Sequence, residues 1–145
     1  MFPSDLKKEV EIMAEIYRIN PPSLIDSSQF GYSQIVTVQP NAQLIYIAGQ
    51  LGEKPSGKQG SNFETQVDWS FENLSIALQE ANSSIEKIVK ITILVVNHNE
   101  DRLRYISKSR REFFGEHKPT STLIPVPRLA ADWMEFEIDA IALQA

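Results

Sequence analysis

The sequence predicts an α+β or α/β domain in which helices cover one face of a mixed β-sheet. Two long stretches, 61–81 and 100–114, carry apolar residues at helical spacing, and the β-branched segment 85–97 between them is typical of a buried strand. Two apolar segments precede the first of these helices and two follow the second. The order of elements is therefore β-β-α-β-α-β-β, which is typical of one domain built from a helical layer and a sheet.

Composition limits the classes of function to consider. The chain has 145 residues, one domain's worth, and its 14 basic and 19 acidic side chains give a net charge of −5. This acidic balance argues against binding to nucleic acid or an anionic membrane, so small molecules or proteins are the expected partners. Cysteine is absent, which excludes disulfides and thiolate chemistry. His98 and His117 lack metal-ligand spacing, and no metal or other cofactor is expected.

The first residues of the chain are charged and have a helical pattern. Residues 1–13 are charged where a signal peptide is apolar, and no apolar run is long enough for a bilayer, so a cytoplasmic location is expected. Residues 5–17 are predicted to form a helix capped by Ser4. Its apolar stripe is Leu6, Val10, Met13 and Tyr17. We divide the chain into an N-terminal helical extension, 1–29, and a domain, 30–145.

The apolar stripe of this N-terminal helix requires a surface to cover it. Trp69 and Ile76 stand two turns apart on the outer face of the first long helix, where large apolar groups would otherwise be exposed. We expect the N-terminal stripe to dock there.

Turn and cap residues indicate where the next strands and the first long helix begin and end. Segments 32–38 and 44–50 are predicted to form a β-hairpin through the turn QPNA. Ser61 and Glu64 have the spacing of a capping box and are expected to open the first long helix. The buried face of that helix is predicted to be Phe63, Val67, Phe71, Leu74, Leu78 and Ala81. The segment 85–97 is expected to lie at the centre of the sheet.

The C-terminal third of the chain supplies a second helix and two strands. The polar sequence NHNE at 97–100 is expected to cap the helix, and Gly115 is expected to end it. Its predicted stripe is Leu103, Ile106, Phe113 and Phe114. Segments 120–127 and 133–143 are predicted to be strands.

The loop GEKPSGKQ, residues 52–59, has the glycine and lysine spacing of a phosphate-binding P-loop but lacks its other features. Gln59 follows Lys58 where a P-loop has a hydroxyl for Mg²⁺. Pro55 removes a backbone amide, and Glu53 adds negative charge where phosphate would lie. We interpret the segment as a plain turn.

The last predicted strand has two chemically different faces. Alternation places one apolar set under the helices, namely Met134, Phe136, Ile138, Ala140 and Ala142. The opposite set is Trp133, Glu135, Glu137, Asp139, Ile141 and Leu143. One interpretation is a solvated outer face. The other is a face buried against another subunit with the acids in a wet cleft, because an exposed face does not normally carry large apolar groups at both ends.

Four segments together match the motifs of one known family in order and spacing. They are YSQIVTV…LIYIAGQL, ENLSIALQEANSSIEKIVKITILV, FFGEHKPTSTLIPVPRLA and EFEIDAIA, within residues 30–143. The chain resembles the Rid family, also called YjgF and, in an older label, the L-PSP endoribonucleases. The resemblance implies a chorismate-mutase-like α+β fold with two helices on a mixed sheet. It also implies a homotrimer with three clefts between subunits.

The resemblance further implies a small-molecule site in each cleft. In its best-known members this site hydrolyses enamines and imines released by pyridoxal-phosphate enzymes, with an arginine on the substrate carboxylate and a glutamate that positions or activates water. The glutamate corresponds to Glu137, the candidate catalytic residue. The arginine position is occupied by Ser121, whose hydroxyl cannot make the bidentate contact of a guanidinium. The other expected cleft residues are Tyr32, Gly49 and Thr122.

Arg110 is the cation that could replace this arginine. Helical spacing puts it on the apolar stripe of the second long helix, where an arginine requires an anion. We hypothesise that Arg110 approaches the cleft and supplies positive charge to Glu137 or to a ligand carboxylate. The alternative is that it extends into solvent beside Glu112 or Glu116.

These features leave three candidate functions. The first is a cytoplasmic homotrimer whose cleft binds a small metabolite and hydrolyses an enamine, an imine or a related reactive intermediate. The alternative is a non-catalytic metabolite-binding or regulatory protein that uses the same cleft. RNA cleavage, which the older family label suggests, is opposed by the acidic charge, the lack of a basic-aromatic face and the acidic last strand.

Overall fold

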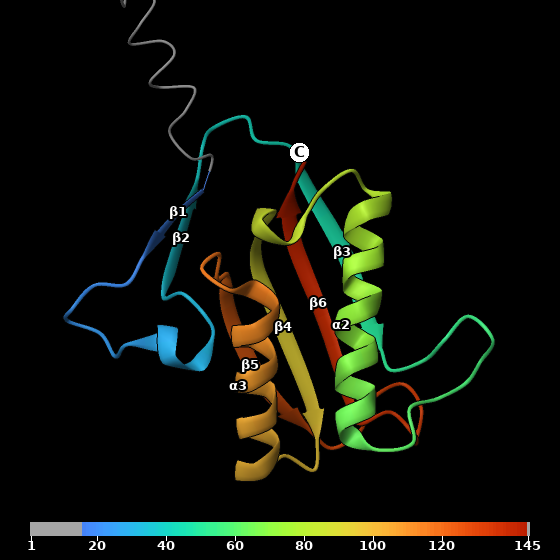
Figure 1. The fold of residues 1–145 in the computed structure, drawn as a ribbon. Helices are drawn as coiled ribbons and strands as arrows, with labels where there is room; N and C mark the ends of the chain where they lie inside the picture. The colour runs from blue at the N-terminus through green and yellow to red at the C-terminus, as the bar shows by residue number, and fades with distance from the viewer. Residues whose placement is uncertain (1–15, 145) are drawn as a thin grey trace, which may run out of the picture.

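The computed structural model describes residues 16–144, which form a four-stranded sheet with two helices on one face and a separate two-stranded sheet (Figure 1). The strands are β1 (Ile16–Ile19), β2 (Ile35–Val38), β3 (Leu44–Leu51), β4 (Ile88–Val96), β5 (Thr120–Val126) and β6 (Phe136–Leu143). The helices are α2 (Phe63–Glu80) and α3 (Glu100–Phe114), with short 3-10 helices η1 (Ser27–Phe30) and η2 (Ile85–Lys87). The predicted α+β fold with a mixed sheet and two helices is confirmed.

The four-stranded sheet has the order β3-β6-β4-β5. β6 runs antiparallel to both β3 and β4, whereas β4 and β5 are parallel and are connected by α3. A parallel pair requires such a crossover, because a tight turn can join only antiparallel neighbours. The predicted central position of segment 85–97 is confirmed, since β4 is an interior strand, and β6 shares the interior with it.

The core lies between the two helices and the sheet face beneath them. α2 contributes the predicted residues Phe63, Val67, Phe71, Leu74 and Leu78. Ala81, predicted to join them, is the C-cap and is only partly buried. The sheet contributes fully buried side chains that include Ile91, Ile93, Val95, Phe136 and Ile138. Burial of each large apolar side chain stabilises the fold by ~1.5–3 kcal/mol, so this interface fixes both helices on the sheet.

Asn62, rather than the predicted capping box, opens α2. Its side-chain oxygen accepts a hydrogen bond from the backbone amide of Thr65 at 2.8 Å. The prediction that Ser61 and Glu64 form the cap is therefore wrong by one residue. Asparagine is as strong a cap as serine, so the two neighbouring residues compete for this role and only the backbone conformation selects one.

The predicted ends of α3 are confirmed. Asn99, within the sequence NHNE, accepts a hydrogen bond from the amide of Arg102 at 2.8 Å. Gly115 ends the helix with φ of 57°, a left-handed value that glycine adopts without strain.

The predicted hairpin between segments 32–38 and 44–50 is wrong. β2 pairs antiparallel with β1, with Ile16 opposite Val38, and β3 pairs with β6. The two strands separate because β3 contributes Ile47 to the main core, whereas the side chain of Val38 stays exposed. Burial against β6 and α2 therefore outweighs the short connection between neighbouring segments.

The predicted N-terminal helix conflicts with the structure where the two overlap. Tyr17 lies in strand β1 and is 42% exposed, so it does not belong to a helical stripe. The rest of the predicted helix, including Leu6, Val10 and Met13, lies outside the described residues. On α2, Ile76 is exposed, and Trp69 lies under the Lys54 ammonium at 4.5 Å from the ring centroid.

Residues 52–59 form a turn between β3 and α2, as interpreted. The amide of Lys54 donates to the carbonyl of Lys58 at 2.9 Å, and the amide of Gly57 donates to Lys54 at 2.8 Å. Glu53 and Gln59 form an antiparallel bridge across the turn. These amides are used within the turn rather than directed at a phosphate.

Candidate functional site

The two faces of the sheet present different chemistry. Along β6, Phe136, Ile138 and Ala140 are buried beneath the helices, so the alternate residues Glu137 and Asp139 project from the other face. In the part of the chain that the structure describes, no helix covers that second face, which we call the open face (Figure 1). The predicted alternation is therefore confirmed for residues 136–140. It is wrong for Glu135, which precedes β6 and forms an ion pair with Arg102 of α3 at 2.8 Å, and Leu143 is buried.

On the open face, Glu137 lies against the backbone of β3 at Gly49. A β-carbon at Gly49 would stand 2.5 Å from Cδ of Glu137 and 2.7 Å from its Oε1, so the carboxyl group can occupy this position only while residue 49 is glycine. The pairing of β3 with β6 shifts register between Ile47 and Gln50, the two residues that flank this position. Such an irregularity re-aims the neighbouring side chains, and here it places the Glu137 carboxyl over bare backbone.

The environment of Glu137 favours its protonated form. Burial raises the pKa of this carboxyl group, and the negative charge of Asp139 raises it further. The two acids are two residues apart on one face of β6. A carboxylate of raised pKa accepts a proton from water more readily than an ordinary one.

On the helix side of the sheet, Arg110 is buried between α3 and β5. Its side chain is only 3% exposed. Nη1 donates to Oγ of Ser121 at 3.0 Å, and Nη2 donates to Oγ of Ser107 at 3.3 Å. The guanidinium carbon lies 5.3 Å from the centroid of the Tyr32 ring, within the range of a cation–π contact. The guanidinium of Arg110 therefore contacts side chains from helix α3, strand β5 and the loop that carries Tyr32.

This charge has no negative partner among residues 16–144. No carboxylate there forms an ion pair with Arg110, and its Nε is buried without a hydrogen-bond acceptor. Burial accordingly lowers the pKa of Arg110 to about 10. The alternative that Arg110 extends into solvent beside Glu112 or Glu116 is wrong.

The loop that carries Tyr32 is fixed on both sides. Gly31, with φ of 84°, packs so closely on α3 that a β-carbon there would lie 2.7 Å from Cβ of Arg110. On the other side, the amide of Ser33 donates to the carbonyl of Pro119 at 2.7 Å, just before β5. Tyr32 stands between these two anchors and is held beside the guanidinium.

A cavity of about 230 Å³ adjoins the guanidinium. It is lined by Phe30, Tyr32, Leu103, Ser107, Arg110, Ser121 and Leu123. Sequence reasoning missed Ser107, although its position three residues before Arg110 on the same helix places the two side chains together. Phe30 was also missed, and no sequence signal identifies it, because η1 reaches this position only through the tertiary fold.

The predicted site residues thus fall into two groups on opposite faces of the sheet. Tyr32, Arg110 and Ser121 meet on the helix side, where Ser121 stands opposite the buried residue Ile91. Gly49 and Glu137 meet on the open face. Thr122, next to Ser121 in the strand, is exposed and projects to the open face as well. Arg110 therefore does not contact Glu137 within the chain.

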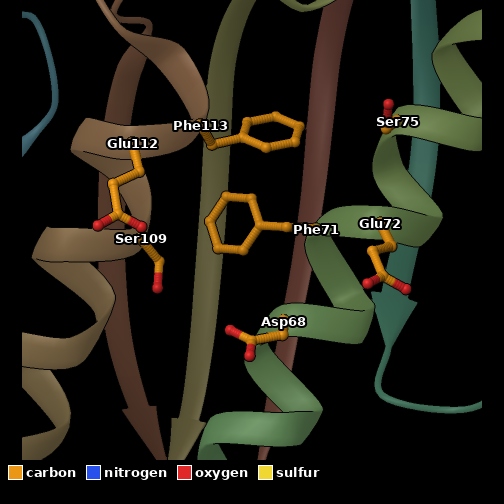
Figure 2. A pocket seen from close by; sticks show the side chains of 7 residues that line it. All are labelled: Asp68, Phe71, Glu72, Ser75, Ser109, Glu112 and Phe113. Atoms are coloured by element: carbon orange, nitrogen blue, oxygen red, sulfur yellow. The ribbon is translucent and has the colours of Figure 1, made fainter.

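A second, larger cavity of about 400 Å³ lies between α2 and α3 (Figure 2). Phe71 and Phe113 face each other there with ring centroids 4.9 Å apart. The carboxylates at its rim are Asp68, Glu72 and Glu112. Asp68 accepts a hydrogen bond from the Tyr105 hydroxyl at 2.7 Å. Glu72 pairs with Lys54 at 2.7 Å, and Glu112 pairs with Lys108 at 3.9 Å. Each rim carboxylate therefore already has a partner, which is a neutral hydroxyl for Asp68 and an ammonium group for Glu72 and Glu112.

Two further findings concern possible metals and membranes. Within residues 16–144, no group of three or more metal-ligating side chains is arranged to hold an ion. No helix of that segment is long and apolar enough to cross a membrane.

By its fold, the protein is a small α+β domain, in which two helices cover one face of a mixed sheet and the open face carries Glu137 and Asp139. Residues 26–144 match the family described as Endoribonuclease L-PSP. The chain belongs to this family, the Rid, YjgF or L-PSP family, which confirms the resemblance inferred from its motifs.

Relatives of several kinds support this membership. A RutC family protein of Pyrococcus abyssi is 30% identical over 113 residues, which cover 77% of this chain and 84% of the relative. TdcF of Escherichia coli, named as a candidate reactive intermediate deaminase, is 28% identical over 106 residues, or 70% and 80% of the two chains. The structure of YyfB from Yersinia pestis, a Rid family protein of unknown function, matches with a TM-score of 0.84 at 28% identity, over 90% and 99% of the chains.

Proposed function

We propose that this protein is a homotrimer whose intersubunit cleft binds a small metabolite and hydrolyses an enamine, an imine or a related reactive intermediate. The observation that carries the proposal is the placement of the two residue groups on opposite faces of one sheet. A single protomer cannot present both groups to one ligand. A second copy that packs its open face near the Arg110 cavity would bring the Glu137 group to the same ligand.

The open face has the composition of an interface between subunits. Tyr46, whose partner on β6 is Ile141, is 73% exposed in the single chain. Leu44 and Ile124 are also exposed on this face. Large apolar groups gathered on one sheet face favour burial against another copy of the chain.

In this proposal Glu137 is the candidate catalytic residue. Its carboxylate accepts a proton from water while the water oxygen bonds to the imine carbon. Glu137 passes this first proton to the nitrogen, which gives an amino alcohol. The carboxylate then takes the remaining hydroxyl proton and delivers it to the nitrogen as the carbon–nitrogen bond breaks, so that ammonia leaves and the carbonyl compound remains. The raised pKa of Glu137 suits both the acceptance and the return of this proton.

The test measures turnover and ligand binding in the Glu137→Gln variant. If the protein is an enzyme, ammonia release from small 2-imino acids should fall to the uncatalysed rate, because glutamine cannot accept the proton. Binding of unreactive 2-keto acids should persist in this variant. Full ammonia release by Glu137→Gln, or a protein that sediments only as a monomer, would contradict the proposal.

A non-catalytic role is the alternative, and one substitution favours it. Ser121 occupies the position where the resemblance implies a substrate-binding arginine. If the protein only senses a metabolite, wild type should release no ammonia from any imine, while binding of keto acids is saturable and survives Glu137→Gln. RNA cleavage is a weaker candidate because the net charge is −5, and we expect no salt-dependent RNA binding.

A further inference from the structure

The buried guanidinium of Arg110 lacks the negative partner that such a group normally has. Its side chain is 3% exposed, and the described residues provide only neutral acceptors, the hydroxyls of Ser107 and Ser121. Taking a charge out of water is costly unless an opposite charge or a full set of hydrogen bonds compensates. A side chain kept in this state is therefore suited to an anion that arrives from outside the chain.

The two serines orient the guanidinium and leave part of it free. A guanidinium has five N–H donors, and each serine hydroxyl accepts from one of the two terminal nitrogens. Nε is buried without an acceptor. A carboxylate that reaches Nε and one terminal N–H would form the paired contact that a planar guanidinium favours.

The adjoining cavity indicates the size and polarity of the rest of the ligand that carries this carboxylate. Its volume is about 230 Å³, and Phe30, Leu103 and Leu123 give it apolar walls. Tyr32 also lines the cavity, and its ring lies next to the guanidinium. Such walls favour a compact apolar body, and one positive charge matches a single negative charge.

We propose that Arg110, positioned by Ser107 and Ser121, binds the carboxylate of a small monocarboxylate whose apolar body occupies this cavity. The anion-binding cation is thus delivered by helix α3 and not by strand β5, where the resemblance implies an arginine. The inference rests on the proposed function for the reaction at Glu137, but binding itself uses the residues of one protomer. A multiply charged phosphate is disfavoured, because the site offers one cation in a chain of net charge −5.

The test compares isovalerate with isovaleramide, which has the same shape without the charge. In a titration of the full-length wild-type protein followed by ¹⁵N NMR, isovalerate should shift the Arg110 Nε–H resonance and isovaleramide should bind much more weakly. This measurement needs no variant, so it is unaffected by any folding defect. Equal affinity for the acid and the amide, or an Nε–H resonance that does not move at saturation, would overturn the proposal.

Variants then test whether Arg110 supplies the positive charge that binds isovalerate. Arg110→Gln should weaken isovalerate binding roughly 10- to 100-fold, the usual effect of losing a charge-assisted contact. The matched control is Arg104→Gln, an exposed arginine of the same helix, which should leave the affinity unchanged. An Arg110→Gln protein that binds isovalerate as tightly as wild type would contradict the inference.

A positional exchange tests the role of Ser121. In Arg110→Gln combined with Ser121→Arg, the cation comes from β5 again, and part of the isovalerate affinity should return. Ser121→Ala in the wild-type background should lower the preference for isovalerate over isovaleramide, and Ser121→Thr should restore it. A purely structural serine would leave this preference unchanged, and that result would remove Ser121 from the site.

The outcomes separate this inference from the proposed function. Glu137→Gln should retain isovalerate binding while losing ammonia release. Retained ammonia release in Glu137→Gln would refute the hydrolytic function and leave the anion site intact. Isovalerate binding that is indifferent to Arg110 would refute the anion site and leave the assignment of Glu137 intact.

Discussion

Replacing Arg110 by methionine should make the ligand-free protein more stable. The guanidinium is buried without a carboxylate, and burial lowers its pKa from 12.5 to about 10. One pKa unit corresponds to ~1.4 kcal/mol, so folding penalises the charged side chain by ~3 kcal/mol. Because the folded pKa is below the unfolded one, this penalty is fully present at every pH below about 10, including neutral pH.

The gain from this substitution is partly offset by lost hydrogen bonds. Methionine has a similar length and fills the same space, but Ser107 and Ser121 lose the donors that now serve them. Two such bonds contribute ~2 kcal/mol in total. The net stabilisation is therefore ~1 kcal/mol, which corresponds to a rise in Tm of ~2–4 °C for a domain of this size.

Thermal and urea unfolding of Arg110→Met and of a matched control measure this effect. Arg104→Met is the control, because Arg104 is exposed on the same helix and forms an ion pair with Asp101. Its free energy of unfolding should change by no more than ~0.5 kcal/mol. If Arg110→Met unfolds at a lower temperature than both wild type and this control, the guanidinium has a stabilising partner and the reasoning above is wrong.

Three further predictions follow from single contacts. Glu137→Gln should raise the Tm at neutral pH, because a carboxyl group whose pKa is raised by folding destabilises the protein when it is charged. When Tm is measured against pH, the difference between the variant and wild type should vanish below the ordinary pKa range of glutamate, and a difference that stays constant would contradict the prediction. Gly49→Ala should push the Glu137 carboxyl towards solvent and lower its pKa, measurable by ¹³C NMR titration; an unchanged titration would mean that the contact is absent. Asn99→Ala should cost ~1 kcal/mol in urea unfolding through loss of the α3 cap, with Lys108→Ala, at an exposed position of the same helix, as the control that leaves the cap intact.

Elements with a strong local pattern could be predicted from the sequence. The stripe of α2 and the β-branched run of β4 each require burial, and both are buried in the same core, where α2 packs on β3 and β6. The hairpin between residues 32–38 and 44–50 could not be decided in this way. Short sequence separation favours it, but the pairing of β3 with β6 joins segments far apart in the chain, and only the complete core determines that choice.

The candidate site was predictable only in part. Helical spacing correctly put Arg110 on a buried stripe, because the position of a side chain around a helix follows from its number. The separation of Ser121 and Glu137 onto opposite faces of the sheet was not predictable, since it depends on the register that links β5 to β6 through β4. A shift of one residue in either pairing would exchange the faces.

The serine at position 121 and the buried arginine at position 110 are best understood as one feature. The Ser121 hydroxyl accepts a hydrogen bond from Nη1 of Arg110, so any longer side chain at position 121 would occupy space that the guanidinium now fills. An arginine there would also bring a second positive charge close to the first. At ~4 Å separation and an effective dielectric constant of ~20, this repulsion costs ~4 kcal/mol. The small hydroxyl at position 121 is therefore a condition for the burial of Arg110 between α3 and β5.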